Sequence, residues 1–67
     1  MENYKLLKNY YGLRIMMTPS GGLAVCNSWK PLQFFNGVRA VMQATDYILA
    51  LDRTGELARV KKVKVGK

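Results

Sequence analysis

Residues 13–26 read LRIMMTPSGGLAVC, in which two apolar runs flank the tetrapeptide Pro19-Ser20-Gly21-Gly22. Proline fixes its own φ near the value that a turn requires, and glycine adopts a positive φ without steric cost. Short apolar segments on either side of such a turn are typical of a β-hairpin. We therefore expect strands at 13–18 and 23–26, joined through 19–22.

The same arrangement of a turn between apolar runs recurs in the C-terminal half. Residues 47–52 and 56–60 flank Arg53-Thr54-Gly55, and this glycine can take the left-handed position of a three-residue hairpin turn. Between the two hairpins, VRAVMQ at 38–43 fits a buried strand, and its periodicity alone does not exclude a short helix.

The first eleven residues allow two interpretations. Tyr4, Leu7 and Tyr11 recur at helical spacing, which would suit one short helix ending at Gly12. A shift of 34 positions, however, lays residues 4–26 over residues 38–60. Because local propensity is weaker evidence than a pattern that recurs in the same chain, we expect a strand here.

This internal match predicts one three-strand unit used twice. Its identities are Gly21 with Gly55, Leu23 with Leu57, and Ala24 with Ala58. The expected fold is all-β, a small antiparallel meander of about five or six strands in a compact sandwich or barrel, which self-association could complete. The expected organisation is a single small β domain over 1–67, with units 4–26 and 38–60, a connector 27–36 and a basic tail 61–67.

The second unit also resembles a repeat of a known family. It runs as Val38-Arg39-Ala40-Val41, then Tyr47-Ile48-Leu49-Ala50-Leu51, then the turn Asp52-Arg53-Thr54-Gly55 followed by Glu56-Leu57. In this order it is similar to a repeat of the regulator of chromosome condensation family, and the likeness extends over residues 12–60. The resemblance implies a β-propeller ancestry and a role in protein and chromatin binding. Two units do not close a propeller, and the resemblance implies no catalytic residues.

Composition argues against catalysis. The chain has 67 residues with 11 Lys and Arg, 4 Asp and Glu, no His and a net charge of +7. Without His there is no imidazole base, no His metal ligand and no Ser-His or Cys-His pair. Asp52 and Glu56 are interpreted as turn residues, and Cys26 as a buried apolar residue. We expect no enzyme activity, no metal and no cofactor.

The positive charge predicts a polyanionic partner. No acid occurs between Asn3 and Thr45, and the tail is rich in lysine. The predicted polyanion-binding residues are Lys30, Arg39, Arg59, Lys61, Lys62 and Lys64. Trp29, Tyr10 and Tyr11 are the predicted partner-binding aromatics, because such rings stack on unpaired bases. Phe34 and Phe35 are expected in the core. The alternative is that the tail lysines only solvate the surface or protect a sheet edge.

Two functional hypotheses follow. The first is a non-enzymatic binding protein whose basic surface engages nucleic acid or a nucleic-acid-handling complex. The second is a protein-interaction module, such as a small phage or mobile-element inhibitor of the anti-CRISPR type. The lone cysteine and the lack of a secretory or membrane-spanning segment predict a cytoplasmic protein.

Overall fold

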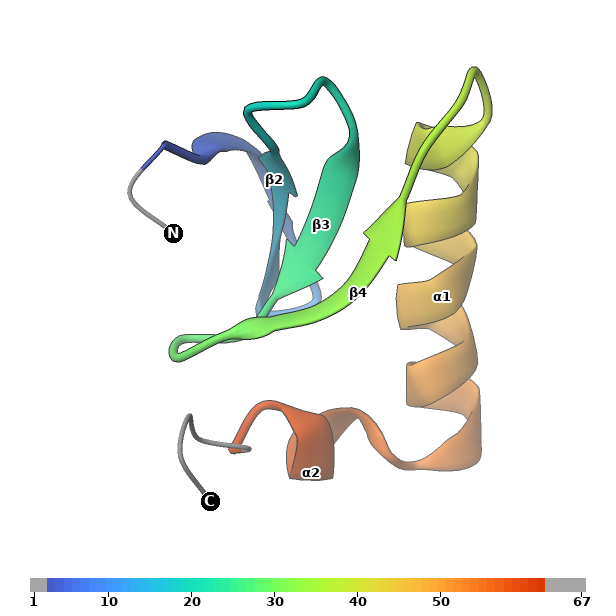
Figure 1. Ribbon diagram of the computed structural model, residues 1–67. Coiled ribbons are helices and arrows are strands. Elements are labelled where there is room, and N and C mark those ends of the chain that lie inside the picture. The colour runs from blue at the N-terminus through green and yellow to red at the C-terminus, as the bar shows by residue number, and fades with distance from the viewer. Residues whose placement is uncertain (1–2, 63–67) are drawn as a thin grey trace.

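The computed structural model describes residues 3–62, which form a four-stranded antiparallel sheet followed by two helices (Figure 1). Neighbouring strands in the chain are neighbours in the sheet, so the strand order is β1-β2-β3-β4. The elements are β1 Lys5–Tyr10, β2 Leu13–Met17, β3 Leu23–Cys26, β4 Pro31–Phe35, α1 Ala40–Thr54 and α2 Leu57–Val60.

The N-terminal hairpin is confirmed. β2 pairs with β3 from Arg14 opposite Cys26 to Met17 opposite Leu23. The intervening turn closes through the Thr18 amide, which donates to the Gly22 carbonyl at 3.0 Å, and through the Gly22 amide, which donates to Thr18 Oγ1 at 3.0 Å. Residues 19–22 therefore form the hairpin turn that their residue types predict.

The N-terminal segment is a strand, as expected, and not a helix. β1 pairs with β2, with Tyr10 opposite Leu13, so only Tyr11 and Gly12 form the connection. Both have positive φ, 55° and 83°. Two consecutive residues with positive φ make the type I′ turn, whose twist matches that of a two-strand ribbon.

The C-terminal half corrects the all-β prediction. The strands expected at 38–43 and 47–52 fall largely within α1, so the sandwich or barrel of two three-strand units is wrong. The residues that α1 buries are Ala40, Ala44, Ile48 and Leu51. Their spacing of three or four residues matches the helical period, which places them on one face. The expected last strand at 56–60 is instead replaced by α2.

Gly55 has the backbone conformation that the expected hairpin turn requires, but it serves a helix end. Its φ is 80°, the left-handed conformation that a hairpin turn would have used, but it caps the C-terminus of α1. The Gly55 amide donates to the Asp52 carbonyl at 3.2 Å, and the Glu56 amide donates to the Leu51 carbonyl at 3.0 Å. Both motifs need the same glycine conformation, and here the helix uses it.

The expected connector at 27–36 contains the fourth strand. β4 pairs with β3, with Phe35 opposite Leu23. The strand begins at Pro31, which has no amide hydrogen to donate to a neighbouring strand. Proline is tolerated at this position because β4 is an edge strand and Pro31 is its first residue. Irregular pairing between Val25 and Cys26 hides the alternation that would have revealed it.

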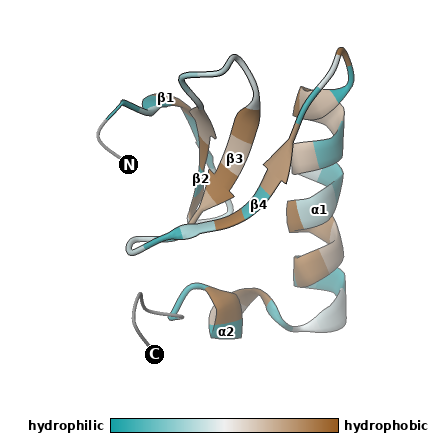
Figure 2. Cartoon of the chain, viewed as in Figure 1, coloured by the Kyte–Doolittle hydropathy of each residue, from teal (hydrophilic) through white to brown (hydrophobic). Residues whose placement is uncertain are grey.

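The core lies between α1 and one face of the sheet. Leu13, Ile15 and Val25 are fully buried on the strands and meet the apolar face of α1. The brown residues on the sheet-facing side of α1 in Figure 2 mark this layer. At its margin the rings of Phe35 and Tyr47 meet edge to face, with centroids 5.8 Å apart.

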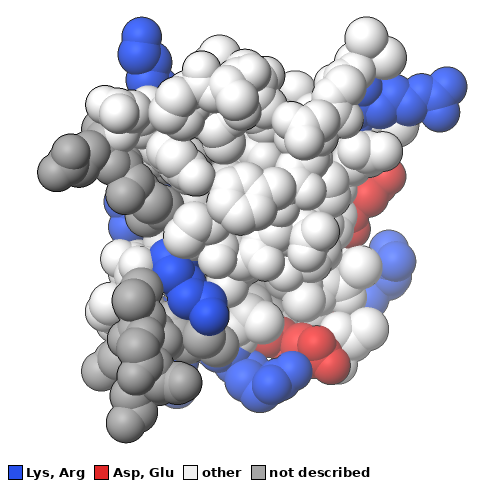
Figure 3. All heavy atoms as spheres, viewed as in Figure 1, with Lys and Arg blue, Asp and Glu red and all other residues white. Residues whose placement is uncertain are grey.

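The charged residues on the surface lie at the periphery of the face that Figure 3 shows. In Figure 3 the middle of the face in view, over β3, β4 and α1, carries no charged residue, and Lys and Arg lie at its edges. Asp and Glu appear only along α1 and near the connection to α2. The acids of the described chain, Asp46, Asp52 and Glu56, indeed all belong to this helical segment.

The register of α1 can be tested by truncating one buried and one exposed residue of the helix. Ile48 is fully buried and Met42 is 60% exposed. Ile48→Ala should lower the free energy of unfolding by about 2–4 kcal/mol because the side chain's burial is removed and a cavity remains, whereas Met42→Ala should change it by less than about 0.5 kcal/mol. Urea denaturation followed by circular dichroism measures both. Equal effects would show that the helix faces the sheet differently.

Candidate functional site

A buried amide side chain, Asn27, organises one end of the molecule. It is 2% exposed, and its Oδ1 accepts hydrogen bonds from the amides of Trp29 and Lys30, both at 2.8 Å. Its Nδ2 donates to the Val60 carbonyl at 2.8 Å. The Asn27 amide donates to the Lys30 carbonyl at 3.1 Å and closes the β3–β4 turn. One side chain thus shapes that turn and ties it to the end of α2.

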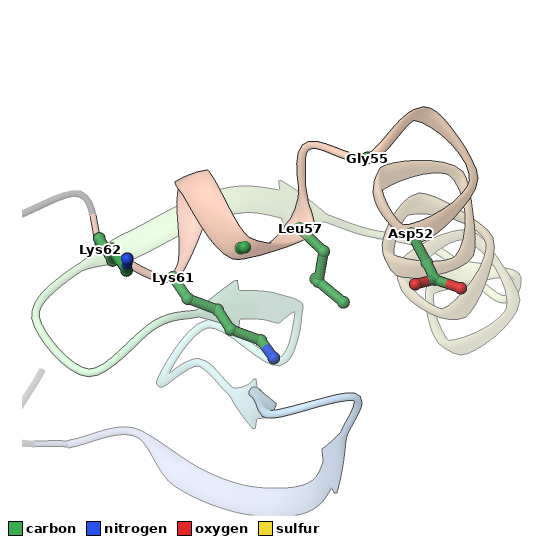
Figure 4. Close-up of a pocket in the computed structure, with 6 residues that line it drawn as sticks. Asp52, Gly55, Leu57, Lys61 and Lys62 are labelled. Carbon is green, nitrogen blue, oxygen red and sulfur yellow. The ribbon is translucent and has the colours of Figure 1, made fainter.

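The β1–β2 turn lies at the same end of the sheet. Arg14, near the start of β2, is opposite Cys26, the last residue of β3, so the turn before β2 and the turn after β3 are on the same side. A Cβ placed on Gly12 would lie 2.6 Å from Lys61 Nζ. The Lys61 side chain therefore extends from the end of α2 to the backbone of Gly12. Figure 4 shows this side chain directed away from the α2 ribbon toward the sheet.

Three distant segments consequently meet at what we call the basic-aromatic end, defined by Tyr11, Trp29, Lys30, Lys61 and Lys62. Tyr11 is 46% exposed and Trp29 is 43% exposed. Lys30 and Lys61 are half-buried, and Lys62 is exposed. Aromatic rings and ammonium groups are thus exposed at the same end, a combination that proteins binding single-stranded nucleic acids use.

Tyr11 is held in an unfavourable backbone conformation. Its φ of 55° makes it the only described residue other than glycine with a positive φ. For a residue with a Cβ this conformation costs about 1–2 kcal/mol. Its ring lies 4.8 Å from that of Tyr10, which in turn has Lys8 Nζ 4.8 Å from its centroid. The strained turn thus carries a partly exposed ring at this end of the sheet.

The structure brings together only part of the predicted polyanion site. Lys30, Lys61 and Lys62 gather, whereas Arg39 precedes α1 at the opposite end of the molecule (Figure 1). Arg59 pairs with Glu56 at 3.4 Å, an exposed ion pair of little energetic value that nevertheless offsets its charge. Lys64 and the rest of the tail from residue 63 lie outside the described residues.

The predicted aromatic residues also separate into two kinds. Trp29 and Tyr11 are exposed, but Tyr10 is half-buried and packs against the core. Phe35 is in the core margin as expected, whereas Phe34 is 53% exposed and corrects the expectation that both would be buried. Sequence reasoning missed Asn27. An Asn directly after a strand is itself a turn signal, but its bond to Val60 has no local signature.

A shallow pocket of about 370 Å³ lies beside the basic-aromatic end (Figure 4). Its lining residues are Asp52, Gly55, Leu57, Ala58, Lys61 and Lys62. Two ammonium groups outnumber one carboxylate, so the pocket favours an anionic group over a cationic one. Within residues 3–62 no three metal-ligating side chains come together.

Cys26 is buried and has no reactive character. It is fully shielded from solvent at the end of β3. Burial raises the pKa of its thiol, and the nearby Arg14 only partly opposes that shift. Since the thiolate is the nucleophilic form, a raised pKa makes Cys26 a poor nucleophile.

Comparison with known proteins yields no relative. No family model matches the chain, and no curated protein or solved structure is significantly similar to it. The resemblance of residues 12–60 to the chromosome condensation regulator repeat therefore stays a prediction. Over residues 3–62, no helix combines the length and the apolar character needed to cross a bilayer.

The two roles of Asn27 can be separated by substitution. Asn27→Ala should expose both the β3–β4 turn and α2 to faster amide hydrogen exchange, and should cost about 2–4 kcal/mol of unfolding free energy, because its buried partners are left without hydrogen bonds. Asn27→Asp keeps an acceptor for the Trp29 and Lys30 amides but removes the donor to Val60. At neutral pH it should accelerate exchange at Lys61 and Lys62 while protecting the turn. Identical exchange patterns in both variants would contradict this division.

Proposed function

We propose that the protein is a non-enzymatic binding protein that engages nucleic acid, free or within a nucleoprotein complex, through its basic-aromatic end. The observation that carries the proposal is the convergence of two exposed aromatic rings and three lysines from three chain segments. Asn27 ties two of these segments together, and Lys61 contacts the third.

The chemistry of the site favours a single strand. Lysines that neutralise phosphates release counterions, which supplies affinity without sequence preference. Exposed rings such as Tyr11 and Trp29 gain about 1–3 kcal/mol for each base that stacks on them. A duplex hides the faces of its bases, so only unpaired nucleotides can use both contributions.

A protein-interaction role is the second candidate. An exposed Trp such as Trp29 is also a common anchor of protein interfaces. A small inhibitor of a host nucleic-acid machine, of the anti-CRISPR type, would combine that anchor with a basic surface. A cytoplasmic setting, proposed from the lone buried cysteine, suits either candidate.

Charge reversal at the site, compared with reversal elsewhere, tests the first candidate. Lys30→Glu with Lys62→Glu and Lys5→Glu with Arg39→Glu give the same net charge, but the second pair lies at the opposite end of the molecule. The first pair should weaken binding of a fluorescent single-stranded oligonucleotide by at least about tenfold. It should also reduce the slope of log K against log salt by roughly 1.4, about 0.7 for each phosphate that a lysine no longer neutralises.

The distal pair serves as the control, because it changes the overall charge equally. Equal losses of affinity in both variants would show that attraction is diffuse and that the basic-aromatic end is not the site. Absence of oligonucleotide binding by the wild-type protein at low salt would refute the proposal.

The strain at Tyr11 gives an independent test of aromatic stacking. Tyr11→Asn and Tyr11→Ala both remove the ring, but Asn tolerates positive φ better than Ala does. The Asn variant should therefore be more stable than the Ala variant by about 1 kcal/mol in thermal unfolding, while both bind the oligonucleotide at least about fivefold more weakly. If both variants bind as well as wild type, Tyr11 does not contact the ligand.

A further inference from the structure

The sheet has a second face that no described helix covers. α1 and the apolar residues of α2 belong to the core on one side, where Leu13, Ile15 and Val25 point. Partners in register share a face, so the opposite face carries Leu6, Met16, Ala24 and Phe34, which lie opposite one another across all four strands. We call these four residues the apolar row.

The apolar row combines a buried centre with exposed ends. Ala24 is fully buried, whereas Leu6 is 54% exposed and Phe34 is 53% exposed, one on each edge strand. Sheets bury an apolar face against another layer, as this sheet does with α1 on its other side. Met16 between them is half-buried, so the row exposes large apolar side chains at both edges of the sheet, and exposed apolar surface of this kind marks an interaction site.

A second copy of the chain is a poor occupant. Four strands spaced about 4.8 Å apart, each about five residues long, give a face of about 300 Å², well below the roughly 800 Å² that each partner of a stable complex buries. Two copies would also bring together chains that each carry a net charge of +7. Because the face is small, charge attraction must supplement apolar contact, so we expect an occupant that carries the opposite charge.

The surface beside the apolar row carries positive charge. A second cross-strand set on the same face contains Arg14 and Cys26, and it leads into the β3–β4 turn with Lys30. No acid occurs on any strand of the sheet. Three of the four residues of the apolar row are aliphatic, which suits apolar side chains of a protein better than bases, since base stacking needs aromatic rings.

We propose that this open face docks an acidic amphipathic helix of a partner protein. The apolar stripe of that helix packs on the apolar row, and its flanking carboxylates face Arg14 and Lys30. The helix forms a third layer, opposite α1. This inference shares Lys30 with the proposed nucleic-acid site, but the apolar row lies outside the basic-aromatic end, so substitutions in the row test the inference by itself.

The test uses two synthetic helical peptides of about 18 residues, each with one leucine stripe and otherwise either Glu or Lys, labelled with fluorescein. The Glu peptide should bind the full chain, and the Lys peptide should bind at least about tenfold more weakly. Phe34→Ser should raise the dissociation constant for the Glu peptide about tenfold or more, whereas Met42→Ser, an equally exposed apolar site on α1, should change it less than about twofold. Chemical shifts of Ala24 and Cys26 should move on titration.

Several outcomes would overturn the proposal. These are failure of the Glu peptide to bind, equal binding of the Lys peptide, and equal effects of Phe34→Ser and Met42→Ser. A wild-type dimer in light scattering that Phe34→Ser dissociates would identify a second copy as the occupant instead. If Phe34→Ser does not fold, Leu6→Ser at the other end of the apolar row replaces it. Oligonucleotide binding should survive Phe34→Ser, so each proposal can fail separately; its loss would assign this face to nucleic acid.

Discussion

The hydrogen bonds of Asn27 are the constraint on which the proposed binding end depends. A buried amide must satisfy both its donor and its acceptor, because an unpaired one costs about 1–3 kcal/mol. Asn27 does so by accepting from the Trp29 and Lys30 amides and donating to Val60, 33 residues away. Without that donor, α2 would be held less firmly against the sheet. Lys61 would then not be held over the β1–β2 turn.

The charged residues are distributed unequally between the two layers of the fold. The strands and their turns carry Lys and Arg without any acid, whereas the described acids lie on α1 and on its connection to α2. The sheet and its turns therefore attract anions more strongly than α1, where carboxylates offset part of the positive charge. The basic-aromatic end and the open face both belong to the attractive side, although they present different chemistry.

Local chemistry explains which elements could be predicted from the sequence. The turn at 19–22 specifies a hairpin because its proline and glycines have conformations that few other structures use there. The positive φ of Gly55 was equally predictable, but a left-handed glycine ends a helix as readily as it turns a hairpin. Leu49, Ala50 and Leu51 are consecutive apolar residues, so neither helical nor strand periodicity stands out. Packing of Ile48 and Ala44 against the sheet decides for the helix.

The site was predictable as residue types but not as an arrangement. Lysines near Trp29 and in the tail suggested a polyanion surface, yet only the long-range bond of Asn27 selects Lys30, Lys61 and Lys62 and leaves Arg39 far away. Phe34 and Phe35 show the same limit on one strand. They are adjacent in sequence, so they point to opposite faces, and α1 covers only one of them. Phe35 meets Tyr47 in the core margin while Phe34 stays exposed. Which phenylalanine can reach a partner is thus determined by where the single long helix packs, and that is a property of the whole fold.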